Sequence, residues 1–504
     1  MHPVDPAGLV SVVGAGTMGT GIAQIAALAG HPVILLDATP GRAETAVGEL
    51  GATLQKLAGK GRLDPTQAQA AAARVRAGSD FAELGKASLV IEAAVENLDV
   101  KRQIFAALED VVGDDAVLAT NTSSLSISAI GARLRRPERL VGMHFFNPPP
   151  LMPLVEVVVG VSTDREVAAG VAATATAWGK TPVLVSSTPG FVVNRVARPF
   201  YGEALQALEQ RAAEAQTIDA VLRECGGFRM GPLELTDLIG QDVNAAVNRS
   251  VWEAFGHDPR YRPSLAQQAL VDAGLLGRKS GRGFYAYPGG PGAAATSAAE
   301  QPVGNVVVGG DWGPWEPLWS RVAEAGVAVT RRDPGGERLA QLPGVVLAPT
   351  DGRTATDRAR GGGPVALVDL LGDAATATRI AVTVSDGCPA AARSGVVGVL
   401  QATGAAVTVL DDLPGMLVAR TVAMLVNEAV DVVGCGVASA GDVDLAMRLG
   451  VGYPRGPLEW GDALGADRVV ALLDALADTY RDGRHRACPA LRRAAVSGRR
   501  LRDL

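Results

Sequence analysis

The sequence contains 504 residues, which at roughly 150 residues per domain predicts three or four domains. Hydrophobic residues make up 48% and charged residues 20%, a balance typical of globular rather than disordered chains. The formal net charge is −6, from 47 basic and 53 acidic residues, and no run of Lys or Arg interrupts the chain. This charge pattern argues against a nucleic-acid partner.

Cysteine spacing and hydropathy exclude two further classes of protein. The four cysteines are far apart in the sequence, at Cys225, Cys388, Cys435 and Cys488, so we expect no metal site and no disulfide framework. No apolar run approaches the roughly 18–20 residues of a membrane span, and the first residues lead into a strand pattern without a basic leader. We therefore expect an unprocessed cytoplasmic protein with no membrane partner.

From Leu9 to about Ser187, short apolar runs alternate with longer segments of helical period. This rhythm is typical of βαβ units and predicts a parallel sheet. The predicted strands are Leu9–Val13, Val33–Leu36, Leu89–Ala93, Val117–Thr120, Leu140–His144, Val155–Val159 and Pro182–Val185. After Pro189-Gly190 the pattern is mostly helical to about Leu276, which predicts a domain boundary near residue 188.

The second half of the chain begins after a stretch rich in Gly, Pro, Ala and Ser, from Ala286 to Gly304, which has the composition of a flexible linker. Short strands of a second, smaller α/β unit are predicted at Val306–Val308, Val327–Thr330, Val345–Ala348, Val365–Leu370, Ile380–Val384 and Ala406–Leu410. From Pro414 the pattern is helical again. We expect an α/β domain at 1–188, a helical domain at 189–287, a linker at 288–304, a reduced α/β domain at 305–412 and a second helical domain at 413–504.

The last helical segment repeats the first at a constant offset along the chain. Pro189-Gly190 matches Pro414-Gly415, and Gly231-Pro232-Leu233-Glu234 matches Gly456-Pro457-Leu458-Glu459. Further matched pairs are Arg195 and Arg420, Glu203 and Glu428, Asp219 and Asp444, Asp237 and Asp462, and Gly240 and Gly465. An ungapped match of this length predicts one helical fold used twice.

A glycine-rich turn follows the first predicted strand. Gly14, Gly16 and Gly19 form a Gly-x-Gly-x-x-Gly pattern, and Thr17 and Met18 open the next helical segment. Glycines allow a tight turn and a close approach of the backbone to a pyrophosphate, whose charge the helix N-terminus favours. The pattern alone also occurs in ordinary turns. Its position between strand and helix predicts a Rossmann-type dinucleotide site.

Asp37 ends the second predicted strand, which follows the glycine turn and its helical segment. A carboxylate at this point accepts hydrogen bonds from the adenosine ribose and repels a 2′-phosphate. The sequence therefore predicts NAD as the cofactor, rather than NADP. The alternative is that Asp37 is a solvated residue at the end of a strand.

His144 is the candidate general base. It closes a strand at the carboxyl edge of the predicted sheet, where open α/β folds bind ligands. A histidine at a strand end is, by itself, more often structural. Glu156 lies further along the chain inside an apolar strand, where a carboxylate must be paired or protonated. A pair of His144 and Glu156 would hold the imidazole in one tautomer and stabilise its protonated form, as alcohol oxidation requires.

Several motifs occur together between residue 9 and about residue 287. They are the glycine turn, Val95-Glu96-Asn97 with Lys101, Asn121-Thr122-Ser123-Ser124, His144-Phe145-Phe146-Asn147-Pro148, Glu156, Pro189-Gly190-Phe191 with Asn194-Arg195, and Gly277-Arg278-Lys279-Ser280-Gly281-Arg282-Gly283-Phe284-Tyr285. In this combination and order the chain resembles the L-3-hydroxyacyl-CoA dehydrogenase family of fatty acid β-oxidation and related pathways.

The resemblance implies a Rossmann domain followed by a helical domain and NAD-dependent oxidation of an L-3-hydroxyacyl-CoA to a 3-oxoacyl-CoA. It implies that His144 is the general base, that Glu156 orients it, and that Ser123 and Asn194 bind the reacting oxygen or the thioester. It also implies cofactor contacts from Glu96, Lys101, Asn147 and Lys279. The CoA phosphates are expected to meet Lys56, Lys60 or Arg62, unless these residues form a solvated helix face.

The plan of the whole chain resembles the long bacterial members of this family, including those that act on 3-hydroxyadipyl-CoA in phenylacetate degradation. The alternatives are a short-chain enzyme for 3-hydroxybutyryl-CoA and, more remotely, a non-catalytic NAD(H)-binding protein. In the second helical copy Ala419 stands at the place of Asn194, and the reduced α/β unit lacks the glycine pattern. We therefore expect one active site per chain, with the two helical copies forming an internal pseudo-dimer or the chain forming a homodimer.

Overall fold

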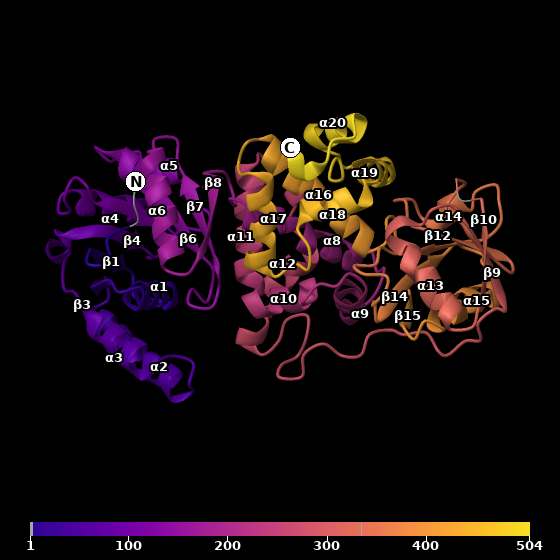
Figure 1. Cartoon of the computed structure of the whole chain (residues 1–504), viewed down its shortest axis with the longest axis horizontal. Coiled ribbons are helices and arrows are strands. Elements are labelled where there is room, and N and C mark those ends of the chain that lie inside the picture. Colours follow the sequence, from indigo (N-terminus) through magenta and orange to yellow (C-terminus); the bar gives the residue numbers. More distant parts are fainter. Residues whose placement is uncertain (1–3, 334) are drawn as a thin grey trace. The chain divides into compact units, whose positions relative to one another are not determined.

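The computed structural model describes residues 4–333 and 335–504. The chain folds into two units, the first comprising Met1–Arg195 with Cys435–Val451 and the second Val196–Gly434 with Gly452–Leu504 (Figure 1). Within the described residues, no helix is long and apolar enough to cross a membrane. The same residues hold no disulfide and no cluster of side chains suited to a metal ion.

The first unit contains an eight-stranded sheet in the order β3-β2-β1-β4-β5-β6-β7-β8. Its strands are β1 (Leu9–Val13), β2 (Val33–Leu36), β3 (Val75–Ala77), β4 (Ala87–Glu92), β5 (Val117–Thr120), β6 (Leu140–Phe145), β7 (Leu154–Val159) and β8 (Thr181–Ser186). All seven predicted strands are confirmed. The sequence does not reveal β3, because this short edge strand has one buried residue, Val75, and no apolar run.

Helices surround this sheet. They are α1 (Thr17–Leu28), α2 (Arg42–Gly59), α3 (Pro65–Arg74), α4 (Leu98–Glu109), α5 (Ile127–Gly131), α6 (Arg165–Ala177), α7 (Val193–Val196), which leads into the second unit, and α17 (Ala440–Val451). The central strands are buried on both faces, as the adjacent residues Ser11 and Val12 of β1 show with 0% exposure. This burial explains the unbroken apolar runs in the sequence.

The prediction of a parallel sheet is wrong at one pair of strands. β6 and β7 run antiparallel, because the segment between Phe145 and Leu154 is too short for the crossover that a parallel pair requires. β7 and β8 are parallel again and are joined through α6. The antiparallel register sets His144 directly opposite Glu156.

The second unit contains a seven-stranded mixed sheet in the order β10-β9-β11-β12-β13-β14-β15. Its strands are β9 (Asn305–Gly309), β10 (Ala328–Arg332), β11 (Ala340–Leu342), β12 (Val345–Pro349), β13 (Val365–Val368), β14 (Arg379–Val384) and β15 (Ala406–Val409). The six predicted strands are confirmed, and β11 is the one that the sequence does not reveal. The accompanying helices are α13 (Glu316–Glu324), α14 (Ala355–Arg358) and α15 (Ala390–Gln401) (Figure 1).

The predicted linker has neither helix nor strand, but its backbone is not free. Ala295 N–H donates to the Thr217 hydroxyl, Ser297 N–H donates to the carbonyl of Val407 in β15, and Glu300 N–H donates to the Gln401 side chain. These bonds hold the segment against the smaller sheet, so its Gly- and Pro-rich composition reflects an extended path rather than free movement.

The helices of the two copies follow the same order along the chain. The first copy contributes α8 (Arg198–Glu209), α9 (Ala215–Ala220), α10 (Pro232–Ile239), α11 (Gln241–Ala254) and α12 (Leu265–Asp272). The second contributes α16 (Val418–Gly434), α17, α18 (Pro457–Leu464), α19 (Ala466–Tyr480) and α20 (Pro489–Ser497). α10 and α18 begin and end at matched positions of the repeat. The repeat extends to the backbone, because Phe191 and Met416 both take a positive φ, of 49° and 54°.

Buried carboxylates join α8 of the first copy to α16 of the second, two helices that lie side by side (Figure 1). Glu203 accepts hydrogen bonds from Arg420 Nε at 2.7 Å and from Arg484 Nε at 2.9 Å. The matching Glu428 is bound by Arg260 Nη1 at 3.3 Å. Each copy therefore supplies the cations that neutralise the buried carboxylate of the other. Burial alone would raise the pKa of Glu203, but Arg484 and Arg420 hold it well below its usual range.

Each helical copy also contributes a segment that packs against the sheet of the other half of the chain. In the first unit α17, from the second copy, packs against β7 and β8, and Ser186 N–H donates to the Val437 carbonyl at 2.8 Å. In the second unit the segment after α9, from the first copy, packs against β14, where Arg379 Nε donates to Glu224 at 2.9 Å. Each sheet is thus covered in part by the helical copy that follows the other sheet.

Candidate active site

The glycine turn after β1 has the shape that a dinucleotide needs. A Cβ at Gly14, where φ is +112°, would lie 2.5 Å from the Ala93 carbonyl oxygen, and one at Gly19 would lie 1.8 Å from the Gly14 carbonyl oxygen. Neither position admits a side chain. A Cβ at Gly16, by contrast, would have no described atom within 4 Å. The turn is therefore closed toward the protein and open at Gly16, next to the N-terminus of α1, where a pyrophosphate fits.

Asp37 lies directly after β2 and faces this turn. Its carboxylate accepts a hydrogen bond from Ala15 N–H at 2.7 Å and one from Thr39 N–H at 2.9 Å. Burial raises the pKa of Asp37, but these N–H bonds outweigh burial and leave the pKa below its usual value. The group is therefore charged at neutral pH, and a fixed negative charge beside the turn suits a ribose with free hydroxyls.

A buried ion pair lies at the end of β4. Lys101 is 1% exposed and its Nζ donates to Glu92 Oε1 at 2.7 Å, with Glu96 Oε2 at 3.4 Å. Thr120 of β5 donates to the other oxygen of Glu92 at 2.7 Å. The Lys101 ammonium group thus lies between two carboxylates. No role is predicted for Glu92 from the sequence, although an acid that ends an apolar strand is a signal of such a pair.

Glu96 determines the conformation of the loop that carries Ser123. One oxygen of Glu96 accepts bonds from the Thr122 hydroxyl at 2.6 Å, from Ser123 N–H at 3.1 Å and from the Ser124 hydroxyl at 2.8 Å. Burial raises the pKa of Glu96, while Thr122 and Lys101 lower it, and the net shift is downward. The charged carboxylate therefore acts as an anchor for the loop after β5.

The pair of His144 and Glu156 is present as the sequence predicts. His144 Nδ1 lies 2.7 Å from Glu156 Oε2, and the two residues are 5% and 0% exposed. The other oxygen of Glu156 accepts the backbone N–H groups of Val192 at 3.0 Å and Val193 at 2.9 Å. Both carboxylate oxygens are thus hydrogen-bonded, which offsets the cost of burying this group.

Aromatic rings fix the plane of the imidazole. The His144 ring lies 4.6 Å from the Phe146 ring and 5.7 Å from the Phe191 ring, between centroids. Because Nδ1 is bonded to Glu156, Nε2 is the nitrogen that can exchange a proton with a substrate. Asn121 Oδ1 accepts Phe145 N–H at 2.8 Å and so ties the loop after β5 to the end of β6. Asn121 belongs to one of the sequence motifs, but the motif does not predict this role.

Ser123 and Asn194 meet at the same edge of the sheet. Asn194 Nδ2 donates to the Ser123 carbonyl oxygen at 3.5 Å, and Asn194 lies shortly after Phe191 in the chain. Asn147 follows Phe146 beyond the end of β6. The remaining predicted contacts lie elsewhere. Lys56 and Lys60 are exposed at the end of α2, and Lys279 belongs to the second unit, where its Nζ pairs with Asp242 at 2.6 Å.

In the second unit Asp369 has the hydrogen-bonding role of Glu156, but by the repeat it stands at the position of His144, and Ala381 stands at the position of Glu156. Asp369 directly follows β13 and accepts the N–H groups of Leu417, Val418 and Ala419 at 2.8–2.9 Å. By the repeat, Leu417 and Val418 match Val192 and Val193. Burial raises the pKa of Asp369 to about 6, although these N–H bonds lower it. An acid directly after a buried apolar strand is the sequence signal that points to this site.

Comparison with known protein families matches most of the chain. The family described as 3-hydroxyacyl-CoA dehydrogenase, NAD binding domain, matches residues 9–188. The C-terminal domain of 3-hydroxyacyl-CoA dehydrogenase matches residues 190–287 and again residues 415–502. The reduced Rossmann-fold domain of 3-hydroxybutyryl-CoA dehydrogenase matches residues 347–414.

Individual proteins match over the whole length or over the first half. The 3-hydroxyadipyl-CoA dehydrogenase of Escherichia coli (strain K12) is 44% identical over 97% of each chain. A crystal structure of 3-hydroxybutyryl-CoA dehydrogenase from Escherichia coli K12 has a TM-score of 0.90 at 42% identity and covers 98% of this chain and 99% of that one. The 3-hydroxybutyryl-CoA dehydrogenase of Clostridioides difficile is 38% identical and covers 55% of this chain and 99% of its own.

Proposed function

The chain belongs to the 3-hydroxyacyl-CoA dehydrogenase family, and from this premise we propose that it oxidises 3-hydroxyadipyl-CoA to 3-oxoadipyl-CoA with NAD. The family gives the reaction, an NAD-dependent dehydrogenation at C3 of an acyl-CoA. The observation that favours the six-carbon dicarboxylic acyl group is the 44% identity, over 97% of both chains, to a protein named for that substrate. The similar structure named for 3-hydroxybutyryl-CoA makes the short-chain thioester the second candidate.

In the proposed reaction His144 Nε2 accepts the proton of the substrate 3-hydroxyl. The glycine turn and Asp37 would hold NAD, which would supply the acceptor for the hydride from C3. Glu156, at 2.7 Å from Nδ1, stabilises the imidazolium that forms and keeps Nε2 directed at the substrate. Two N–H bonds to its other oxygen support this role for Glu156, because they satisfy that buried oxygen and fix the orientation of the side chain.

Ser123 and Asn194 are proposed to bind the substrate oxygen that gains negative character as the carbonyl forms. Two hydrogen bonds support this role: Asn194 Nδ2 donates to the Ser123 carbonyl, and Ser123 N–H donates to the Glu96 carboxylate. On the cofactor side, Gly14, Gly16, Gly19, Thr17 and Met18 would cradle the pyrophosphate, and Asp37 would bind the adenosine ribose. Exposed ammonium groups support a role for Lys56 and Lys60 toward the phosphates of CoA.

Lys101, Asn147 and Lys279 are proposed to act on the cofactor through their neighbours. Lys101 neutralises Glu92 and Glu96 at the cofactor end of the sheet, which supports a positioning role. Asn147 continues the segment that carries His144. Lys279 neutralises Asp242 in the second unit.

We propose the five-part organisation into 1–188, 189–287, 288–304, 305–412 and 413–504, with one active site per chain. Each helical copy supplies an arginine that binds the buried carboxylate of the other copy, Glu203 or Glu428. These contacts support an internal pseudo-dimer of the helical copies. Asp369 and Ala381 occupy the positions that match His144 and Glu156, and the loss of both dyad residues supports a single catalytic centre. Free thiols at all four cysteines, with Cys435 exposed, support a reducing compartment, the cytoplasm.

The test is the rate of NADH oxidation by the purified chain with 3-oxoadipyl-CoA and with acetoacetyl-CoA, compared as kcat/KM. We expect at least tenfold preference for the dicarboxylic substrate. Preference for acetoacetyl-CoA would assign the short-chain reaction instead. Activity with neither substrate, together with normal NADH binding, would contradict a dehydrogenase of this type. The variant His144→Ala measures the background rate in each assay.

A further inference from the structure

The second unit contains a cavity of about 390 Å³ that no step of the dehydrogenase reaction uses. Its walls come from the end of β12, the first turns of α16 and the first half of α19, and all its lining residues belong to the second unit. The volume is within the range of small-molecule sites. The cavity therefore has the size of a ligand site and shares no residue with the His144 centre.

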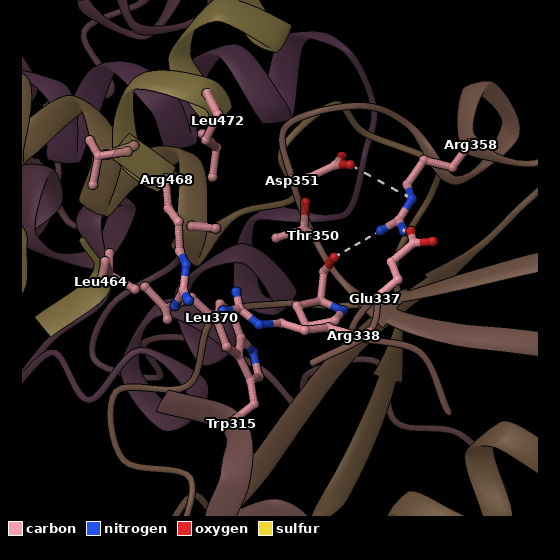
Figure 2. Close-up of a pocket in the computed structure, with 16 residues that line it drawn as sticks. Trp315, Glu337, Arg338, Thr350, Asp351, Arg358, Leu370, Leu464, Arg468 and Leu472 are labelled. Atoms are coloured by element: carbon pink, nitrogen blue, oxygen red, sulfur yellow. Dashed lines mark hydrogen bonds and ion pairs between the residues drawn. The ribbon is translucent and has the colours of Figure 1, made fainter. Parts of the chain in front are cut away.

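One side of the cavity is apolar. Trp315, Leu370, Leu464 and Leu472 line it, as Figure 2 shows. The Trp315 ring is held in place, because its Nε1 donates to the Asp369 carbonyl at 2.8 Å. A fixed indole among leucine side chains suits a hydrocarbon segment of a ligand.

Two guanidinium groups converge on the same cavity. Figure 2 shows Arg338 and Arg468 extending toward each other from opposite walls, beside Leu370 and Trp315. Arg338 Nε donates to the Asp311 carbonyl, a neutral acceptor. Within the described residues neither guanidinium has a carboxylate within 4.0 Å. Two like charges meeting without a carboxylate create a strong preference for an anion.

A third arginine gives the contrast. Arg358 also lines the cavity, but its Nη2 lies 3.3 Å from Glu337 Oε1, its Nε lies 3.7 Å from Asp351 Oδ2, and its Nη1 donates to the Pro349 carbonyl at 3.1 Å. Figure 2 draws Arg358 with these contacts, on the far side from Arg468. Because Arg358 is neutralised, the anion preference is confined to the end of the cavity where Arg338 and Arg468 meet.

Thr350 supplies an independent sign of a missing hydrogen-bond partner. This residue lines the cavity and is 6% exposed, and its hydroxyl has no hydrogen-bond partner among the described residues. A buried hydroxyl without a partner destabilises the folded chain. A ligand oxygen in the cavity would satisfy it.

The repeat explains how the cavity arose. Ala419 and Ala423 of α16 line it and match Asn194 and Arg198 of the first copy, at the same offset as the other matched pairs. The polar side chains of Asn194 and Arg198 are thus replaced by methyl groups, and Asp369 stands at the position that matches His144. The second copy has kept an opening at this place and has lost the residues for chemistry.

We propose that this cavity binds an organic anion with an apolar body, its carboxylate or phosphate paired with Arg338 and Arg468 and its chain packed on Trp315 and Leu472. Nothing in the assignment depends on which acyl-CoA reacts at His144. The expected ligand has one anionic head group on a short hydrocarbon chain. A free carboxylic acid and a phosphate ester both fit this description, and the experiment distinguishes them.

The test is calorimetric titration of the full chain with octanoate, with octyl phosphate and with neutral octanol. At least one of the two anions is expected to bind, and octanol at least tenfold more weakly. The double variant Arg338→Ala/Arg468→Ala is expected to weaken the anion at least tenfold, since each charged hydrogen bond contributes about 1.5–3 kcal/mol. Arg493→Ala, an exposed arginine on α20 outside the cavity, is the matched control and keeps the affinity of the unmodified chain.

Hydrogen exchange identifies the site. Bound octanoate or octyl phosphate is expected to slow amide exchange in peptides covering residues 336–351 and 464–472, and not to do so in the double variant. NADH oxidation by the double variant stays normal, which shows that the chain is folded. If the double variant does not fold, Thr350→Val provides the readout, with an expected loss of three- to tenfold in affinity. Absence of binding by both anions, or equal affinity in the variants, would overturn the proposal.

Discussion

Glu156 and Asp369 perform the same structural task in the two units, although by the repeat Asp369 matches His144 and Ala381 matches Glu156. Glu156 accepts the N–H groups of Val192 and Val193, and Asp369 accepts those of Leu417 and Val418, their counterparts in the second copy. Each carboxylate anchors the start of a helix after a left-handed turn. Glu156 also contacts His144, so the same carboxylate anchors the helix and binds the proposed general base.

This relationship predicts different outcomes for two matched amide substitutions. Glu156→Gln is expected to lower kcat by about 100-fold or more, because the amide no longer stabilises a protonated His144. Asp369→Asn removes the same kind of anchor and is expected to leave kcat within about twofold. Steady-state NADH oxidation with a 3-oxoacyl-CoA measures both. Equal losses of kcat would mean that Glu156 acts through helix anchoring rather than through the imidazole.

His144→Ala is expected to lower kcat by about 10²- to 10⁴-fold, the usual contribution of a general base. NADH affinity, followed by the fluorescence of the bound nucleotide, is expected to change by less than about twofold, because His144 is proposed to act on the substrate hydroxyl and is not part of the glycine turn. Turnover close to that of the unmodified chain would exclude His144 as the base.

Asp37→Ser is expected to reduce the preference for NAD over NADP at least tenfold. The substitution removes the charge that repels a 2′-phosphate, and Arg42, whose Nε donates to the Ala15 carbonyl at 3.0 Å, then becomes the dominant charge beside the turn. The ratio of kcat/KM for the two cofactors gives the result. Asp80→Ser, at another capping aspartate, is the control and should leave the ratio unchanged.

Asp369 also predicts a pH dependence of stability. Its pKa rises to about 6 in the folded chain, so its contribution is full below the unfolded pKa near 3.8 and is lost as pH rises through 6. The loss amounts to about 3 kcal/mol. In Asp369→Asn the free energy of unfolding should therefore fall less between pH 4 and pH 7 than in the unmodified chain. Denaturant titrations at four pH values across this range measure the difference, and parallel curves would refute the assignment.

Local sequence patterns determine most of the fold and the dyad. Apolar runs such as Leu9–Val13 give the strands because both faces of the central strands are buried. The dyad can be predicted because a carboxylate inside an apolar strand, Glu156, requires a partner, and His144 is the nearby group that suits it. The repeat can be read because turn glycines and buried acids keep a fixed spacing.

The features that escaped prediction depend on contacts between distant segments. The reversal of β7 follows from the length of one loop, and β3 and β11 are formed by edge pairing rather than by apolar runs. The burial of Lys101 between Glu92 and Glu96 depends on how β4 meets α4. The placement of α17 on the first sheet depends on tertiary packing, which overrides order along the chain.

The helix α17 connects the distal half of the chain to the reacting groups. A Cβ at Gly450 would lie 2.8 Å from the Leu154 side chain and 3.1 Å from that of Val193. Leu154 lies on the same strand as Glu156, and the backbone N–H of Val193 donates to the Glu156 carboxylate. A chain cut after residue 287 would keep every group of the dyad and lose the helix that covers its strands. The distal half therefore supports the strand that carries Glu156, and its loss would disturb the position of Glu156 relative to His144.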